Sequence, residues 1–286
     1  MHIRNPVEWW VDQWRVAGTA LESIGEAGRR ARETADPRLP AVRRIGAADI
    51  RAVLAKGLDD FAASRTDIIF LTLIYPIAGL VLARLAFGYD MLPLLFPLVS
   101  GFALVGPVAG IGLYEMSRRR EQSLSVSWAD AFGVVHSPAF GSIVLLGLVL
   151  LTIFLLWLAV ANVVYNLTLG PEPPVSIAAF AHDVFTTHRG WAMIVIGIGV
   201  GFLFALLVLA ISVVSFPLLI DRDVDVDTAV RTSLRSVIVN PGPMALWGLI
   251  VAAGLVIGSL PAFVGLIVIM PVLGHATWHL YRRVVS

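Results

Sequence analysis

The sequence predicts an all-α membrane protein. It has six transmembrane helices as three hairpins, each preceded by a short interfacial helix, and an N-terminal amphipathic helix. Hydrophobic residues make up 58% of the 286 residues and charged residues only 14%, whereas soluble domains carry about 25% charged residues. Apolar runs of membrane-spanning length also alternate with short charged segments. So few charges cannot cover the surface of a soluble globule, so the bilayer must be part of the solvent.

An amphipathic helix is predicted before the membrane domain. Asn5 suits the N-cap and Pro6 the first helical position. Trp10 and Trp14 follow at helical spacing on an apolar stripe, while the charges of the helix nearly cancel. The helix can lie on the membrane, dock on a partner or pack against the protein's own inner face, and the sequence leaves all three open. The predicted divisions are residues 1–34 for this helix, 35–46 for a linker and 47–286 for the membrane domain.

The spans follow from length and hydropathy. A helix needs about 20 mostly apolar residues to cross the hydrocarbon core. The stretch 244–281 is too long for one span, and Gly-Ser-Leu-Pro at 258–261 divides it. The predicted spans are residues 68–87, 91–116, 140–164, 191–220, 244–259 and 262–281.

The distribution of basic residues predicts the orientation. Cytoplasmic flanks of membrane helices carry an excess of Lys and Arg. With the N-terminus inside, 19 of the 21 Lys and Arg residues lie on the inner side, and only Arg84 and Arg189 lie near the outer side. We therefore expect both termini to be cytoplasmic.

Two inner-edge segments resemble each other. They are GPVAGIGLYEMSRRR (106–120) and MPVLGHATWHLYRRV (270–284), and they align Pro107 with Pro271 and Arg118 with Arg282. Both lie at the inner end of an even-numbered span, so the likeness predicts a parallel repeat. The residues predicted to have structural or interface roles are Trp10, Trp14, Pro107, Pro271, Trp278, Tyr281, Arg118 and Arg282.

Three short segments precede the odd-numbered spans. LDDFAASRTD (58–67), ADAFGVVHSP (129–138) and AVRTSLRSVIVNP (229–241) each combine small or charged residues with an apolar stripe. We interpret each as an interfacial helix, with Asp227 as the cap of the last one.

Three strings resemble a known family. They are GPVAGIGLYEMSRRRE (106–121), FPLLIDRDVDVDTAVRTSLRSVIVNPGPMALWG (216–248) and LPAFVGLIVIMPVLGHATWHLYRR (260–283). The chain resembles, over roughly residues 45–284, the bacterial predicted integral membrane proteins designated domain of unknown function 2189. Gly-His-Ala-Thr-Trp-His-Leu-Tyr-Arg is the most specific string. The resemblance implies a bacterial inner-membrane protein and brings no established activity or catalytic residue with it.

The histidine pair His275 and His279 is the main candidate for chemistry. Residues at i and i+4 share one helix face and can bind one metal ion, and the repeat makes Glu115 the candidate third ligand. The competing interpretation is an inner-edge anchor, because an aromatic residue followed by two arginines is typical of a membrane boundary. We favour the anchor and expect no metal and no cofactor. The same alignment predicts a Glu115–His279 pair between the second and sixth spans.

Several function classes lack the residues that they need. The chain has no cysteine, which excludes disulfides and thiolate chemistry. No nucleophile–base motif or phosphate-binding loop is recognisable, and no His, Lys or carboxylate lies in the middle of a predicted span, where proton-coupled transporters usually carry one. The net charge of +1 gives no reason to expect nucleic acid.

The expected function is that of a non-enzymatic inner-membrane protein: an accessory, scaffold or assembly subunit of a membrane complex. One alternative is a transporter or channel for a neutral or lipid-like solute. A weaker alternative is a redox subunit with a metal or haem at the inner edge. The expected partners are the lipid bilayer and either another membrane protein or a second copy of the chain.

Overall fold

A computed structural model describes residues 39–72, 77, 79–81, 84, 92–172 and 174–286. These residues form helices without any named strand. The elements are α2 (Ala47–Thr72), η1 (Leu92–Leu94), α4 (Leu95–Ala109), α5 (Ile111–Glu121), η2 (Trp128–His136), α6 (Phe140–Thr168), α7 (Ile177–Thr186), α8 (His188–Ser212), α9 (Ser215–Asp221), α10 (Val226–Val239), α11 (Pro241–Ser259) and α12 (Leu266–Val284).

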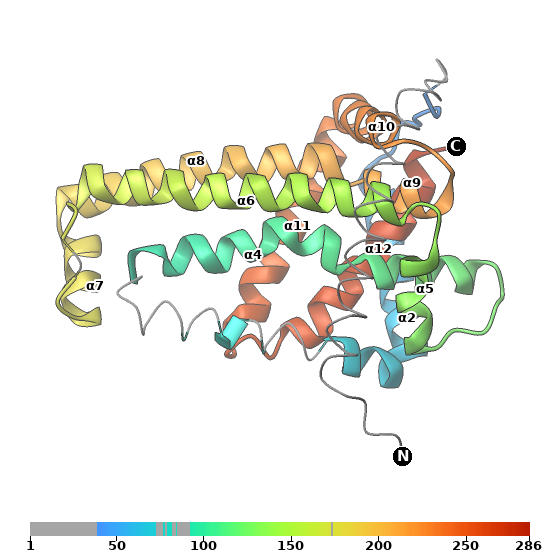
Figure 1. The fold of residues 1–286 in the computed structure, drawn as a ribbon, viewed down its shortest axis with the longest axis horizontal. Coiled ribbons are helices and arrows are strands. Elements are labelled where there is room, and N and C mark those ends of the chain that lie inside the picture. The colour runs from blue at the N-terminus through green and yellow to red at the C-terminus, as the bar shows by residue number, and fades with distance from the viewer. Residues whose placement is uncertain (1–38, 73–76, 78, 82–83, 85–91, 173) are drawn as a thin grey trace, which may run out of the picture.

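The helices α6 and α8 form a long antiparallel pair that sets the longest axis of the molecule, with α7 lying crosswise at its far end (Figure 1). Trp157 of α6 fills the space between the helices: its ring centroid lies 5.6 Å from that of Phe204, and its indole N–H donates to the Pro97 carbonyl at 3.0 Å. Gly201 packs closely against this ring: a Cβ on it would lie 3.1 Å from the Trp157 ring, so the ring would have to shift slightly. Trp157 therefore joins α6, α8 and the start of α4.

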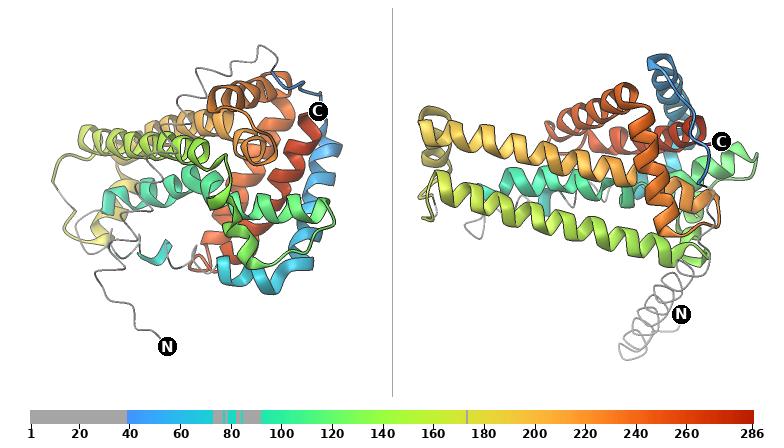
Figure 2. Two further views of the ribbon diagram at one scale, coloured as in Figure 1. Left: turned by 45° about the vertical axis from the view of Figure 1, so that its right-hand side comes forward. Right: turned by 90° about the horizontal axis from the view of Figure 1, so that it is seen from above.

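The helices α11 and α12 run obliquely to the α6–α8 pair, as the views in Figures 1 and 2 agree. Residues 260–265 connect them, and Ala262 and Phe263 adopt positive φ angles of 49° and 66°. The two helices approach closely at Gly258, where a Cβ would lie 2.6 Å from the Leu266 side chain. The apolar stretch 244–281 is thus two packed helices, with its break next to Gly-Ser-Leu-Pro.

The opposite end from α7 collects the polar elements. The helices α2, α5, α9 and α10 lie there together with η2 and the C-terminal residues (Figures 1 and 2). Residues 39–46 of the predicted linker form no helix and are hydrogen-bonded to the rest of the fold. The Arg43 N–H donates to the Val284 carbonyl at 2.8 Å, and Asn240 accepts from the Ile45 N–H at 2.8 Å. We call this end of the molecule the polar end.

Three helical segments are long and apolar enough to cross a membrane: Phe140–Thr168, His188–Asp221 and Pro241–Ser259. They coincide with the predicted spans 140–164, 191–220 and 244–259. Few of their residues are buried within the protein, as expected for helices that face lipid or a partner. The six-span count stays a prediction. Neither α4 nor α12, which cover much of the predicted spans 91–116 and 262–281, is among the three segments, and most of the predicted first span (68–87) lies outside the described residues.

Some predicted boundaries differ from the structure. The predicted second span (91–116) is divided at Gly110 into α4 and α5. Pro107 has no N–H to donate and Gly110 has no side chain to support the helix, which accounts for the weakness at this point. The predicted interfacial helix 58–67 is not separate, because α2 continues through it to Thr72.

The predicted cap of α10 was wrong by two residues. Asp225, not Asp227, is the N-cap, and its Oδ1 accepts from the Thr228 N–H at 2.9 Å. Asp227 lies in the first turn and instead binds Arg231. The predicted N-terminal helix 1–34, with Trp10 and Trp14, lies outside the described residues.

Candidate functional site

The candidate site lies where α2, α5 and α12 meet at the polar end. Two glycines let these helices approach α12. A Cβ on Gly57 would lie 2.7 Å from the Ala276 Cβ and from the Val272 carbonyl oxygen, and a Cβ on Gly274 would lie 2.6 Å from the Leu113 side chain. At Gly57 a larger residue would require a shift of the helices, because backbone atoms of α12 lie within this distance, whereas at Gly274 the Leu113 side chain would have to move. The close approach brings short polar side chains from all three helices together.

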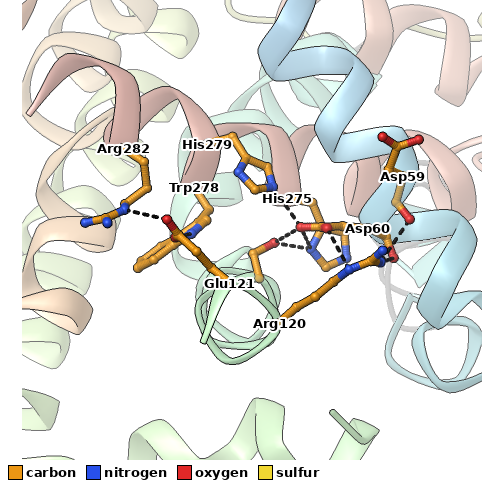
Figure 3. A network of polar contacts seen from close by, with 9 residues as sticks. Asp59, Asp60, Arg120, Glu121, His275, Trp278, His279 and Arg282 are labelled. Atoms are coloured by element: carbon orange, nitrogen blue, oxygen red, sulfur yellow. Dashed lines mark hydrogen bonds and ion pairs between the residues drawn. The ribbon is translucent and has the colours of Figure 1, made fainter. Parts of the chain in front are cut away.

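Asp60 is the centre of this site (Figure 3). Its Oδ2 accepts hydrogen bonds from the Ser117 hydroxyl at 2.6 Å and from His279 Nε2 at 2.9 Å. Arg120 approaches its other oxygen, Oδ1, with Nε at 3.3 Å. Asp60 is 7% exposed, and an isolated carboxylate buried to this extent would be costly. The three donors offset that cost. We call the set of residues Asp60, Ser117, Arg120, His275 and His279 the Asp60 cluster.

The proton positions follow from the chemistry of the partners. An ionised carboxylate only accepts, so Ser117 and His279 both donate to Asp60. The Ser117 proton is then engaged, and His275 Nδ1, at 2.7 Å from Ser117 Oγ, must carry its own proton and donate. Hydrogen bonds thus run from His275 through Ser117 to Asp60, and from His279 to the same oxygen. His275 Nε2 is buried with no hydrogen-bond partner in the described part of the chain.

The pKa of Asp60 is lowered below its usual value of 3.8. Burial by itself would raise this pKa. The hydrogen bonds from His279 and Ser117, together with the nearby histidine charges, outweigh burial and favour the carboxylate. Asp60 is therefore ionised at neutral pH and acts as an acceptor.

A second set of contacts lies beside the Asp60 cluster (Figure 3). Glu121 accepts from the Trp278 indole N–H at 3.0 Å and from Arg282 Nε at 3.1 Å. Asp221 accepts from the Tyr281 hydroxyl at 2.6 Å and from Arg282 at 3.4 Å. These bonds join α5, α9 and α12. Trp278 and Tyr281 are both buried, with ring centroids 5.5 Å apart.

The predicted pair between Glu115 and His279 was wrong. Glu115 binds Arg118, one turn further along α5, through two hydrogen bonds of 2.7 and 2.9 Å. His279 instead binds Asp60. Glu115 and Arg118 are neighbours on one face of α5, so they can form a bidentate ion pair however the other helices pack. This local contact determines the partner of Glu115.

The residues considered for a metal site do not form one set. His275 and His279 share a helix face as expected, but the candidate third ligand Glu115 is bound to Arg118. Within the residues that the structure describes, no group of three or more His, Asp or Glu side chains is placed to hold a metal ion. The prolines of the two resembling segments lie inside helices, Pro107 in α4 and Pro271 in α12.

Asp60 and Ser117 were not singled out from the sequence. Asp60 is one of two adjacent aspartates in a segment interpreted as an interfacial helix, and Ser117 precedes three arginines. The only signal in the sequence was indirect. A histidine pair on one buried helix face needs a hydrogen-bond acceptor, and Asp60 is one of the few carboxylates that lie next to an apolar stripe. Distinguishing Asp60 from Glu115 required the packing of α2 on α12.

Comparison with known families bears on the identity of the chain. Residues 95–221 match the family described as predicted integral membrane protein (DUF2189). The resemblance seen in the sequence is confirmed for this segment, and the chain is an integral membrane protein with several apolar helices. The DUF2189 segment runs from α4 to α9 and includes Ser117 and Arg120, whereas Asp60 and the histidine pair lie outside it. No curated protein and no solved structure matches the chain.

The geometry of the Asp60 cluster suits binding between helices better than chemistry on a substrate. Ser117 donates to a carboxylate and has no free base beside it, unlike an activated nucleophile. His275 and Ser117 are each 1% exposed. The hydrogen bonds that Asp60 accepts from Ser117 and His279 hold α2, α5 and α12 against one another.

Proposed function

We propose that this DUF2189 protein is a non-enzymatic membrane subunit that serves as an accessory, scaffold or assembly factor for a membrane complex. The observation that carries the proposal is the Asp60 cluster with its neighbouring contacts at Glu121 and Asp221. Charged side chains of α2, α5, α9 and α12 bind one another across helices. They form a rigid platform at one end of apolar helices, which is the arrangement expected of a docking subunit.

We further propose that the chain crosses a bacterial inner membrane six times, with both termini in the cytoplasm. The distribution of arginines supports this orientation. Arg118, Arg222 and Arg282 lie at the polar end with the C-terminal residues, whereas Arg189 lies beside α7 at the other end (Figure 1). An excess of arginine at one end is the pattern of a cytoplasmic face.

A mild-detergent pull-down of the full chain tests the accessory role. We expect a membrane protein, or a second copy of this chain, to co-purify in stoichiometric amount. The test variant is Asp60→Asn, which keeps the size of the side chain and removes its negative charge. Because this change weakens the contacts between the helices, less partner should be retained than by the wild type. A protein that stays alone and monomeric in several mild detergents and in native membranes would overturn the proposal.

A transporter or channel for a neutral or lipid-like solute is the second candidate. The breaks between α4 and α5 at Gly110, and between α8 and α9 at residues 213–214, support it, because interrupted helices frequently line transport sites. The cavity beside Glu115 and Arg118 measures about 50 Å³, whereas sites for small organic ligands occupy about 300–1,000 Å³. Solute flux into vesicles that contain only the purified chain would favour transport over the accessory role.

A further inference from the structure

The helix α10 presents an outer face that no described element covers. Its inner face buries Ala229, Thr232, Ser233 and Ser236. Its outer face, at i, i+3, i+4 and i+7, consists of Arg231, Leu234, Arg235 and Ile238, all of them exposed. Ile238 is 76% exposed, which is costly for a large aliphatic side chain in water. The helix therefore mixes arginines and large apolar residues on its free side.

The arginines of this face differ in their partners. Arg231 is held by Asp227, with Nε 2.8 Å from Oδ2. Arg235 forms no ion pair with any described residue. The charge of Arg235 is thus available to an external anion, and that of Arg231 is already neutralised.

Two more arginines, Arg43 and Arg44, lie beside the C-terminal end of α10. Asn240, the C-cap of α10, donates from Nδ2 to the Arg43 carbonyl at 3.0 Å and accepts from the Ile45 N–H. This fixes Arg43 and Arg44 beside the end of α10. Both are exposed, and neither side chain has an ion-pair partner among the described residues. The nearby carboxylate of Asp49 is engaged by Arg283 at 3.7 Å and by the Gly46 N–H.

We propose that this surface, made of Arg43, Arg44, Leu234, Arg235 and Ile238 and called the α10 patch, binds the phosphate groups of anionic phospholipids. The helix runs crosswise to α6 and α8 at their polar end (Figures 1 and 2). If α6 and α8 cross the bilayer, α10 lies parallel to its surface at the level of the headgroups. Arginine guanidinium groups bind phosphate oxygens there while aliphatic neighbours enter the acyl boundary.

A lipid fits the patch better than an acidic protein does. Leu234 and Ile238 alternate with Arg235 along one helix face instead of forming a separate apolar centre with a polar rim, as protein interfaces do. The chain also passes directly from α10 into α11, which exposes Leu246 and Leu249 and is apolar enough to span a membrane. The helix that follows the patch thus also exposes large apolar side chains and is itself suited to the bilayer interior.

Native mass spectrometry of the full chain in mild detergent tests the proposal. Phosphatidylglycerol and phosphatidylcholine with identical acyl chains are offered at equal concentration. We expect phosphatidylglycerol to be retained in preference. Retention should fall about fivefold for each of Arg43→Gln and Arg235→Gln, the typical contribution of one basic residue at an anionic surface. Arg231→Gln, on the same face but paired with Asp227, is the matched control and should bind like the wild type.

Three results would overturn the proposal. The first is equal retention of both lipids by the wild type. The second is displacement of phosphatidylglycerol by millimolar inorganic phosphate that itself binds through the same arginines, which would indicate a soluble phosphate site. The third is binding of an acidic protein that is lost in the Arg43→Gln and Arg235→Gln variants, while the same variants retain phosphatidylglycerol as the wild type does. Added salt should weaken lipid binding by the wild type, which checks the electrostatic origin without any substitution.

Discussion

His279 Nε2 lies 2.9 Å from Asp60 Oδ2, although 219 residues separate the two in the chain. This contact joins the first described helix to the last and lies against α5, so it bears on the stability of the whole polar end. Hydrogen bonds to a charged group contribute about 1.5–3 kcal/mol. The contact is therefore a measurable part of the free energy of unfolding, and its partners can be tested separately.

His279→Ala should lower the free energy of unfolding by about 1.5–3 kcal/mol, because it removes a donor from a buried carboxylate. Unfolding in mixed micelles, followed by tryptophan fluorescence, measures the change. In a double-mutant cycle with Asp60→Asn, the double mutant should lose less free energy of unfolding than the two single variants together, since the residues share one interaction. Glu115→Ala should instead be additive with His279→Ala, because Glu115 binds Arg118. Strong coupling of His279 with Glu115 and none with Asp60 would contradict the geometry.

The Asp60 carboxyl should also make stability depend on pH. Its folded pKa is lowered from 3.8, so its contribution is fully present above the unfolded value and is lost as the pH falls through the lowered folded value. The melting temperature of the wild type should therefore exceed that of Asp60→Asn at pH 5 and above. The difference should shrink only below the usual pKa of an aspartate. A difference that stays constant down to the acid limit would mean that Asp60 does not titrate as described.

Gly57 should not tolerate a side chain. A Cβ there would lie 2.7 Å from both the Ala276 Cβ and the Val272 carbonyl oxygen, and relief requires α2 to move away from α12. Gly57→Ala should therefore destabilise the protein by about 1–3 kcal/mol, the usual effect of overpacking, even though alanine favours helix by up to about 1 kcal/mol. Gly197→Ala is the matched control: it is helical with open space around it and should be neutral or slightly stabilising. Equal thermal stability of the two variants would show that α2 and α12 are not packed this tightly.

The sequence predicted the local features of the fold better than the long-range ones. The three spans that coincide with apolar helices were visible because each is a continuous apolar run of sufficient length. Helical spacing likewise placed His275 and His279 on one face. Their partners were not predictable in the same way, because Asp60 reaches them only through the packing of Gly57 against α12. The repeat suggested Glu115 as the partner of His279. An alignment cannot show that Glu115 is already paired with Arg118, one turn away on the same helix.

Orientation in the membrane can be tested without background labelling, because the chain has no cysteine. Val175 is 96% exposed and lies between α6 and α7, at the opposite end from Ser286 (Figure 1). If the polar end is cytoplasmic, a membrane-impermeant maleimide should label Val175→Cys in intact spheroplasts and should label Ser286→Cys only after lysis. Arg231→Cys, on the exposed face of α10, should behave like Ser286→Cys and confirm that the whole polar end lies on one side. Labelling of Ser286→Cys in intact spheroplasts would reverse the orientation and would also place the α10 patch on the outer leaflet.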